Sequence, residues 1–367
     1  LPSHSTNFHL KMKKYNFFAG PAILPKSVIM KTAESITDFE GMGLSIMEIS
    51  HRSKQFVGVM DKAISLAKEL LNAPDNYEVL FLTGGASSQF YITAMNLLGQ
   101  DQKAAYINTG SWSTKAIKEA QHFGQVDEIA SSKDQNFNYI PKDYNIDPKA
   151  KYLHYTSNNT IFGTQFQNAP ETDIPLVADM SSDIFSRPID VKRHVLIYAG
   201  AQKNMGPAGT TFVMVDKNTL GKVDRHIPTM LDYRTHIAKG SMFNTPPVLP
   251  IYVSMLTMQW IKDHGGVTAM EKKNTEKSEL LYSEIDRNGL FVGNVSAEDR
   301  SKMNVCFSLH NTELEKEFLA ISKEAGCEGL PGHRSVGGFR ASIYNAMDIE
   351  GVQVLVDVMK EFERTHG

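Results

Sequence analysis

Short apolar runs alternate with longer amphipathic ones through about the first 260 residues of this chain. The amphipathic runs repeat at helical spacing, most clearly over residues 56–71, where apolar residues share one face and Lys and Asp occupy the other. The apolar runs have the length and the β-branched or aromatic content of buried strands, and they lie at residues 79–82, 104–107, 152–155, 175–178, 195–199 and 211–215. This alternation predicts an α/β fold in which helices cover a largely parallel sheet.

The pattern changes after a predicted helix at residues 249–263, which ends at Gly265 and Gly266. A smaller unit follows, with predicted strands at 303–309 and 338–344 and predicted helices at 313–325 and 351–364. A chain of 367 residues is long for one domain and sufficient for two that share an interface. We therefore place a boundary at the glycine pair.

The overall charge excludes some partners. The formal net charge is −3, which gives no reason to expect nucleic acid or an anionic membrane as a partner. Any anion that the protein binds must therefore be held by a local cluster of cations.

The cysteine content and the apolar runs bear on localisation. Only Cys306 and Cys327 occur, so a disulfide framework is not expected and a cytoplasmic location fits. No apolar run approaches membrane-spanning length, and the start of the chain has no signal-peptide core. A natural beginning fits at Met12, so residues 1–12 are interpreted as a leader or a vector-derived remnant.

Lys203 is the first candidate for chemistry. It follows the apolar run 195–199 and precedes a segment that contains Gly206 and Gly209. Apolar surroundings disfavour the ammonium form, so a lysine in this setting can become the neutral amine that attacks an aldehyde. The ordinary alternative is a surface lysine in a loop.

Asp179 ends the apolar run 175–178, and one strand with its connection fits between Asp179 and Lys203. The two side chains can therefore lie at neighbouring strand ends, where α/β sheets place ligands. Pyridoxal phosphate (PLP) needs such a carboxylate beside its pyridine nitrogen to keep that nitrogen protonated. The alternative role for Asp179 is the N-cap of a helix.

Two further segments suit a phosphorylated aromatic cofactor. Gly84 and Gly85 lie between a predicted strand and a helix, where free backbone N–H groups bind phosphate. The segment is neither a Walker loop nor a GxGxxG motif. Trp112, one of two tryptophans, opens the helix after strand 104–107 and could lie flat on a cofactor ring. A core tryptophan is the alternative.

These residues resemble the phosphoserine aminotransferase family, fold-type-I PLP enzymes of the class-V aminotransferase group. The likeness runs from Tyr15 to the C-terminus, and residues 48–53, 177–182 and 330–342 are its most specific stretches. The resemblance implies a large domain with a mainly parallel seven-stranded sheet and a smaller α/β C-terminal domain. The implied boundaries are 26–266 for the large PLP-binding domain, and 13–25 with 267–367 for the small one.

The resemblance also implies roles around the cofactor ring. Lys203 would hold PLP as a Schiff base, and Asp179 would pair with the pyridine nitrogen. Trp112 would stack on the ring, while Thr160 would bind on the side of the phenolic oxygen. The chain departs from the family in one nearby position, because Asn159 stands where a glutamate is expected.

Around the cofactor phosphate, the resemblance implies that the N–H groups of Ala86 and Ser87 act together with Gln202. Asn244 and Thr245 would reach this phosphate from the neighbouring subunit, so a homodimer with shared active sites is expected. Some family members have an arginine where Ser87 stands. Phosphate binding here would therefore depend more on backbone groups and hydroxyls.

Two His-Arg pairs, His51-Arg52 and His333-Arg334, lie far apart in the sequence, and Arg340 follows the second pair. No metal site is predicted, because an adjacent guanidinium opposes a divalent cation and no HExxH or Cys cluster accompanies the pairs. Arginine binds carboxylate or phosphate through two parallel hydrogen bonds, although solvated surface pairs are the alternative. By resemblance Arg340 binds the α-carboxylate and the two pairs surround the distal anion, with the subunit that supplies each pair left open.

The activity implied by the resemblance is transfer of the amino group of L-glutamate to 3-phosphohydroxypyruvate, which gives O-phospho-L-serine and 2-oxoglutarate in serine biosynthesis. Lys203 would move the proton at the substrate Cα. Whether 4-phosphohydroxy-L-threonine of pyridoxine biosynthesis is also used stays open.

Two alternatives are weighed against this activity. A cysteine desulfurase of the same class needs a nucleophilic cysteine on a flexible loop, and Cys306 lies in a predicted strand, which leaves only Cys327. A non-catalytic phosphoanion-binding protein on the same fold is the second alternative.

Overall fold

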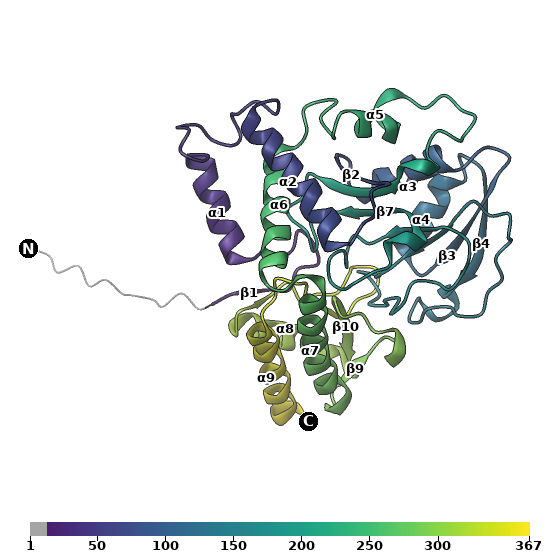
Figure 1. Cartoon of the computed structure of the whole chain (residues 1–367). Helices are drawn as coiled ribbons and strands as arrows, with labels where there is room; N and C mark the ends of the chain where they lie inside the picture. Colours follow the sequence, from purple (N-terminus) through teal and green to yellow (C-terminus); the bar gives the residue numbers. More distant parts are fainter. Residues whose placement is uncertain (1–12) are drawn as a thin grey trace, which may run out of the picture.

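The computed structural model describes residues 13–367, and the predicted leader at 1–12 lies outside them. A sheet covered by helices forms the upper part of the molecule in Figure 1, and the C-terminal helices and short strands form the lower part. Within residues 13–367, no helix has both the length and the apolar character needed to cross a lipid bilayer.

The main sheet has seven strands in the order β2-β8-β7-β6-β5-β3-β4. In this order they are β2 (Tyr77–Leu82), β8 (Thr211–Asp216), β7 (His194–Gly200), β6 (Leu176–Asp179), β5 (Leu153–Thr156), β3 (Lys103–Asn108) and β4 (Gln125–Ser131). Neighbours from β7 to β4 are parallel, whereas β8 runs antiparallel to both β7 and β2. The six predicted strands and the largely parallel sheet are confirmed. Strand β4 was not predicted, because an edge strand with Asp127 and Glu128 lacks a continuous apolar run.

Helices cover both faces of this sheet. Along β2, Phe81 packs into one core and Leu82 into another, because successive side chains of a strand point to opposite faces. The helices are α1 (Lys26–Thr37), α2 (Lys54–Leu70), α3 (Gly85–Leu97), α4 (Ser111–Ala120), α5 (Tyr233–Ala238) and α6 (Val248–Asp263). Helices α2 and α6 contribute to the first core, and α3 and α4 to the second. The predicted helices at 56–71 and 249–263 are confirmed as α2 and α6.

The C-terminal unit has a core of its own. Its elements are α7 (Gly266–Arg287), β9 (Phe291–Gly293), β10 (Asn304–Leu309), α8 (Glu315–Glu324), β11 (Cys327–Glu328), β12 (Phe339–Ser342) and α9 (Ile349–His366). The two strands and two helices predicted here are confirmed. Helix α7 begins at the predicted boundary, but it was not predicted, because most of its residues are polar or charged.

The first described residues join this C-terminal core. Strand β1 (Tyr15–Asn16) pairs in parallel with β11, and the side chains of Tyr15 and Phe17 are buried among residues of the C-terminal unit. The chain then passes into the main sheet unit before α1 begins. The N-terminal segment therefore connects the two cores.

Candidate active site

Three neighbouring strands bring the central candidate residues to one edge of the sheet. Asp179 is the last residue of β6, Lys203 follows three residues after the end of β7, and Thr160 lies four residues after the end of β5. Strands β5, β6 and β7 are adjacent and parallel, so their carboxyl ends meet. The predicted placement of Asp179 and Lys203 at neighbouring strand ends is confirmed.

The Lys203 amine lies between Thr160 and Trp112 at the carboxyl ends of these strands. Its Nζ donates a hydrogen bond of 2.6 Å to Oγ1 of Thr160 and lies 5.6 Å from the centre of the Trp112 ring. Part of the side chain is exposed, yet desolvation in the enclosed site lowers the pKa of Lys203 to about 8, although Asp179 acts in the opposite direction. The amine is therefore close to the neutral form that attacks carbonyl groups.

Within the described residues, only one of the two carboxylate oxygens of Asp179 accepts hydrogen bonds. It is 4% exposed, and its Oδ1 accepts hydrogen bonds from the backbone N–H of Ser181 at 3.0 Å and from its hydroxyl at 2.6 Å. Within residues 13–367 no hydrogen bond reaches Oδ2. Burial raises the pKa of Asp179, so a cationic donor at Oδ2 would stabilise the carboxylate. No helix starts at Asp179, so it is not the helix N-cap that was the alternative.

Trp112 lies in the first turn of α4, beside the amine of Lys203. The following residue, Ser113, is buried and lies 3.0 Å from the Thr156 hydroxyl, which fixes this turn against the end of β5. The Nε1 atom of Trp112 is buried and has no acceptor within the described residues. The ring face toward the Lys203 amine is therefore the part of Trp112 against which a bound ligand can lie.

The turn from β2 into α3 has the form of a phosphate cradle. Gly84 and Gly85 have φ of +99° and +69°, and a Cβ at Gly84 would lie 2.5 Å from Oγ of Ser88. Only glycine fits there. Because α3 begins at Gly85, the N–H groups of Ala86 and Ser87 fall in its first turn, where they have no partner within the helix.

The guanidinium of Arg340 lies next to Thr160, the residue that contacts the Lys203 amine. Arg340 lies in β12, and its Nη1 donates to the carbonyl oxygen of Thr160 at 3.0 Å, while its Nε is buried without a partner in the described part of the chain. His333 and Arg334 lie on the loop before β12. Desolvation, together with repulsion from Arg340, Arg334 and Lys115, lowers the pKa of His333. Arg340 therefore lies close to the Lys203 amine and His333 lies close to Arg340, whereas Arg334 is exposed and its role stays a prediction.

The comparisons with known proteins agree with this geometry. The family model for class-V aminotransferases matches residues 14–355. The chain belongs to the class-V aminotransferases. The phosphoserine aminotransferase of Bacteroides fragilis is 57% identical over 357 residues, which cover 97% of this chain and 100% of the relative. That of Flavobacterium johnsoniae is 60% identical over 353 residues, which cover 96% and 99%.

Solved structures give the same result for the fold of this aminotransferase. The phosphoserine aminotransferase from Bacillus circulans subsp. alkalophilus is 44% identical, with a TM-score of 0.94 and coverage of 97% of this chain and 99% of that one. The PLP-bound phosphoserine aminotransferase from Trichomonas vaginalis is 35% identical, with a TM-score of 0.90 and coverage of 95% and 100%. The predicted family and fold type are confirmed.

Four further predicted residues of this aminotransferase are not joined to the central group within one chain. Arg52, Asn244 and Thr245 are exposed, and His51 is buried in the turn before α2. Within residues 13–367, no hydrogen bond or ion pair connects any of them to Lys203 or Asp179. Asn244 lines a cavity of about 220 Å³ together with Gly84 and Ser88. The roles given to these four residues stay predictions.

Gln202, the remaining predicted phosphate ligand, is partly buried next to Lys203. Its carbonyl oxygen accepts a hydrogen bond of 2.9 Å from the N–H of Ala22. A Cβ at Gly20 would lie 3.3 Å from Cγ of Lys203. The N-terminal segment therefore packs directly against the lysine loop, although the role of the Gln202 side chain stays a prediction.

Asn159 joins two neighbouring loops of this aminotransferase. Its Nδ2 donates to the carbonyl oxygen of Thr109, and its Oδ1 accepts from the N–H groups of Ile161 at 3.2 Å and Phe162 at 3.4 Å. A Cβ at Gly110 would collide with Nδ2 at 2.0 Å. Asn159 therefore ties the loop that carries its neighbour Thr160 to the turn that precedes α4.

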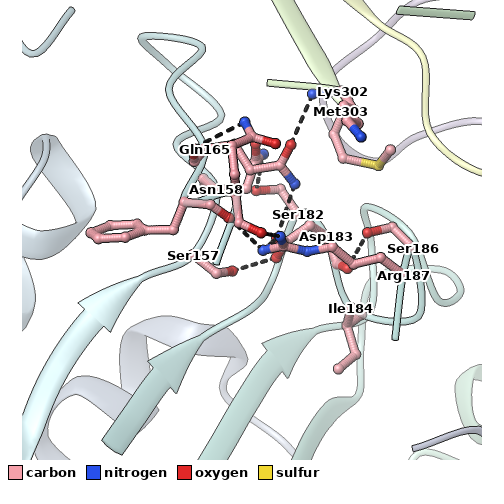
Figure 2. A network of polar contacts seen from close by, with 12 residues as sticks. Ser157, Asn158, Gln165, Ser182, Asp183, Ile184, Ser186, Arg187, Lys302 and Met303 are labelled. Carbon is pink, nitrogen blue, oxygen red and sulfur yellow. Dashed lines mark hydrogen bonds and ion pairs between the residues drawn. The ribbon is translucent and has the colours of Figure 1, made fainter. Parts of the chain in front are cut away.

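Sequence reasoning missed a second buried carboxylate, Asp183. Figure 2 shows it among hydrogen bonds from Ser157, Gln165 and Arg187. Burial raises the pKa of Asp183. The position of Asp183 directly after the motif at 177–182 is a signal that could have found it, but Ser157 and Gln165 could not be predicted as partners, because they belong to the connection after β5 and lie 26 and 18 positions away.

The lowered pKa of Lys203 predicts the pH at which cofactor-free protein captures PLP. Only a neutral amine attacks an aldehyde, and the pKa of Lys203 is about 8 rather than 10.5. The rate of covalent attachment should therefore rise through pH 8 and level off above it. Stopped-flow absorbance over roughly pH 6 to 10, with an N-acetylated lysine amide as the control amine, measures this midpoint. A midpoint near that of the control amine contradicts the expectation.

Proposed function

We propose that this class-V aminotransferase transfers the amino group of L-glutamate to 3-phosphohydroxypyruvate, producing O-phospho-L-serine and 2-oxoglutarate. The observation that carries the proposal is the group of Lys203, Asp179 and Arg340 at one sheet edge: an amine of lowered pKa, a carboxylate with unused capacity and a carboxylate-binding cation. Relatives that are 57% and 60% identical over nearly the whole chain bear the name phosphoserine aminotransferase.

The cofactor is PLP, and the residues present fit it. Lys203 would hold the PLP aldehyde through its amine, and Oδ2 of Asp179 would be the free acceptor that a protonated ring nitrogen needs. We assign the phosphate to the first turn of α3, with Ala86 and Ser87, and the ring face to Trp112. When bound, PLP supplies an electron sink for negative charge at the substrate Cα.

The chain's own residues then handle the proton and the carboxylate. With a pKa of about 8, Nζ of Lys203 can remove the proton from the Cα of glutamate. In the second half of the reaction the same group can deliver a proton to the Cα of the product amino acid. Thr160 holds Nζ at 2.6 Å, and its carbonyl oxygen holds Nη1 of Arg340 at 3.0 Å. One residue therefore positions both the base and the cation that we assign to the α-carboxylate.

The distal anion needs its own cations, because glutamate ends in a carboxylate and 3-phosphohydroxypyruvate in a phosphate. We assign this task to His333 and Arg334, which lie near Arg340, together with His51 and Arg52. A guanidinium can donate two parallel hydrogen bonds to either anion, so one subsite can serve both substrates.

We also propose a homodimer with shared active sites. Large apolar side chains are exposed on α1 and the segment after it, at Ile29 (50%), Met30 (54%), Met42 (37%), Leu44 (46%) and Met47 (58%). Helix α1 lies at the outer edge of the molecule (Figure 1). An exposed apolar surface of this kind is unfavourable in a monomer, and a second copy would cover it. Light scattering should give twice the chain mass of 40.9 kDa, and a single-chain mass would contradict the dimer.

Two further assignments belong to this proposal. We propose a large PLP-binding domain at 26–266 and a small domain made of 13–25 and 267–367, supported by the separate core that Tyr15 and Phe17 share with the C-terminal unit. We also propose a cytoplasmic location, supported by two cysteines that are both free and buried.

Burial of both thiols disfavours a desulfurase. Desolvation raises the pKa of Cys306 to about 12 and that of Cys327 to about 11, so neither is a nucleophilic thiolate near neutral pH. Cys306 also lies within β10 rather than on a flexible loop. An aminotransferase is therefore the activity that this chain supports best.

The deciding experiment is an assay of the PLP-loaded protein with L-glutamate and 3-phosphohydroxypyruvate. Phosphoserine and 2-oxoglutarate should form in equal amounts, and the visible absorbance of the bound cofactor should change when glutamate alone is added. Sulfide release from L-cysteine without phosphoserine formation would favour the desulfurase, and a protein that stays colourless with PLP would favour the non-catalytic alternative.

A further inference from the structure

The turn that follows Asp179 contains a strained residue. Phe185 has a φ of +57°, in the left-handed region that bulky side chains rarely adopt, and its side chain is 1% exposed. Such a conformation persists only where surrounding contacts hold it, and it is typical of places where geometry matters for function. The contacts that hold Phe185 therefore bear on the position of Asp179.

Two buried asparagines donate hydrogen bonds to two successive carbonyl groups of this turn. Asn204 donates from Nδ2 to the carbonyl oxygen of Ile184 at 2.7 Å, and Asn345 donates from Nδ2 to that of Phe185 at 2.9 Å. The two asparagines are also joined, because the N–H of Asn345 donates to Oδ1 of Asn204 at 3.0 Å. They are 5% and 2% exposed, so water does not compete for these bonds.

The two asparagines belong to segments that carry the chemistry. Asn204 directly follows Lys203, and Asn345 lies three residues after the end of β12, the strand that contains Arg340. The turn that they hold is continuous with Asp179. One hydrogen-bonded group therefore connects the segments that supply the amine, the ring carboxylate and the substrate cation.

A third asparagine fixes the orientation of Asn345. Asn274 of α7 donates from Nδ2 to Oδ1 of Asn345 at 2.7 Å and to the carbonyl oxygen of Ser186 at 3.3 Å. Because Oδ1 of Asn345 accepts from Asn274, its Nδ2 must point toward Phe185. Lys277, one turn further along α7, donates to the carbonyl oxygens of Ile343 and Tyr344 at 2.7 Å each, which anchors the segment just before Asn345.

We propose that Asn345 is a positioning residue for transamination: together with Asn204 it holds the strained Ile184–Phe185 turn and so sets the Lys203 amine relative to the Asp179 carboxylate. The inference rests on the proposed function for its kinetic consequence. Its spectroscopic consequence needs only PLP bound at Lys203. Asn345 touches neither the amine nor the carboxylate, so it acts through Asn204 and the turn.

The test compares Asn345→Ala with a matched control, Asn288→Ala, in the PLP-loaded enzyme. Asn288 is also a buried asparagine of the C-terminal unit, and its amide donates to Met359 O at 3.2 Å and to Oε1 of Glu284 at 2.9 Å, outside the group described above. Asn345→Ala should lower kcat roughly ten- to hundredfold with little change in the KM for glutamate, because a misplaced amine slows proton transfer rather than substrate binding. Asn288→Ala should keep the wild-type kcat even if its thermal stability falls.

Two readouts do not depend on turnover. In Asn345→Ala, the pH at which the absorbance of the PLP linkage changes should shift, and amide exchange over residues 180–186 should speed up, both relative to wild type and to Asn288→Ala. If the wild-type protein makes no phosphoserine, the proposed function fails while these two measurements still test the positioning role. Should Asn345→Ala not fold, Asn274→Ala leaves Asn345 in place and should shift the same readouts in the same direction. Wild-type kcat and pH profile in either variant, or an equal kcat loss in Asn288→Ala, would overturn the proposal.

Discussion

Replacing Lys203 by alanine should abolish transamination and the covalent retention of PLP. In the proposed function this side chain supplies both the amine that would hold the cofactor and the group that moves the Cα proton, and no other lysine amine contacts Thr160 within residues 13–367. General acid–base catalysis alone accounts for roughly 10²- to 10⁴-fold in rate, so at least a loss of this size is expected. The phosphoserine assay measures it directly.

The control for this substitution is Lys192, an exposed lysine just before the start of β7, at the opposite end of the strand from Lys203. Alanine at this position should leave the rate unchanged. Borohydride reduction followed by peptide mass analysis gives an independent measurement. Wild-type protein and the Lys192→Ala variant should carry the reduced cofactor on the peptide that contains Lys203. Substantial turnover in Lys203→Ala, or cofactor fixed on another peptide, contradicts the assignment.

Replacing Arg340 by alanine should lower kcat/KM for glutamate by about 10²-fold while PLP stays bound, because a charged partner of a buried substrate anion is lost. Arg340→Lys should also be impaired. Nη1 of Arg340 already donates to Thr160 O, so a substrate carboxylate would use other N–H groups of the guanidinium. A lysine ammonium is a point charge without this planar fork, so it cannot reproduce the two-point hydrogen bond to a carboxylate.

The kinetic pattern distinguishes a substrate-binding role from a general loss of structure. Both Arg340 variants should keep the visible spectrum of the bound cofactor, and Arg364→Ala, at an exposed position of α9, should behave as wild type. Unchanged kinetics in Arg340→Ala would remove this residue from the substrate site. Loss of the cofactor spectrum would show instead that Arg340 supports PLP binding.

The sheet and the central pair of site residues could be predicted because their signals are local. Asp179 and Lys203 each follow an apolar run, and such runs become buried strands whose ends meet in a parallel sheet. Strand β4 and helix α7 were missed for the complementary reason. Their residues are largely polar, and they are stabilised by neighbours that a linear pattern does not reveal.

The polar contacts around the site could not be predicted, because they join residues that are distant in the sequence. Asn204 and Asn345 are 141 positions apart, and nothing in either local segment indicates the other. The roles of His51, Arg52, Asn244 and Thr245 were implied by resemblance alone. For Asn244 and Thr245 the resemblance implies contact with a neighbouring subunit, which the fold of a single chain cannot test.

The short strand β1 has a consequence for the order of events during synthesis. Tyr15 pairs with Cys327, and the segment that follows β1 packs on the lysine loop through Gly20 and Ala22. The contacts of Gly20 and Ala22 can form once the lysine loop has been made, whereas β1 stays unpaired until Cys327 and Glu328 have been translated. The N-terminal segment is therefore fixed at both of its ends only late in synthesis.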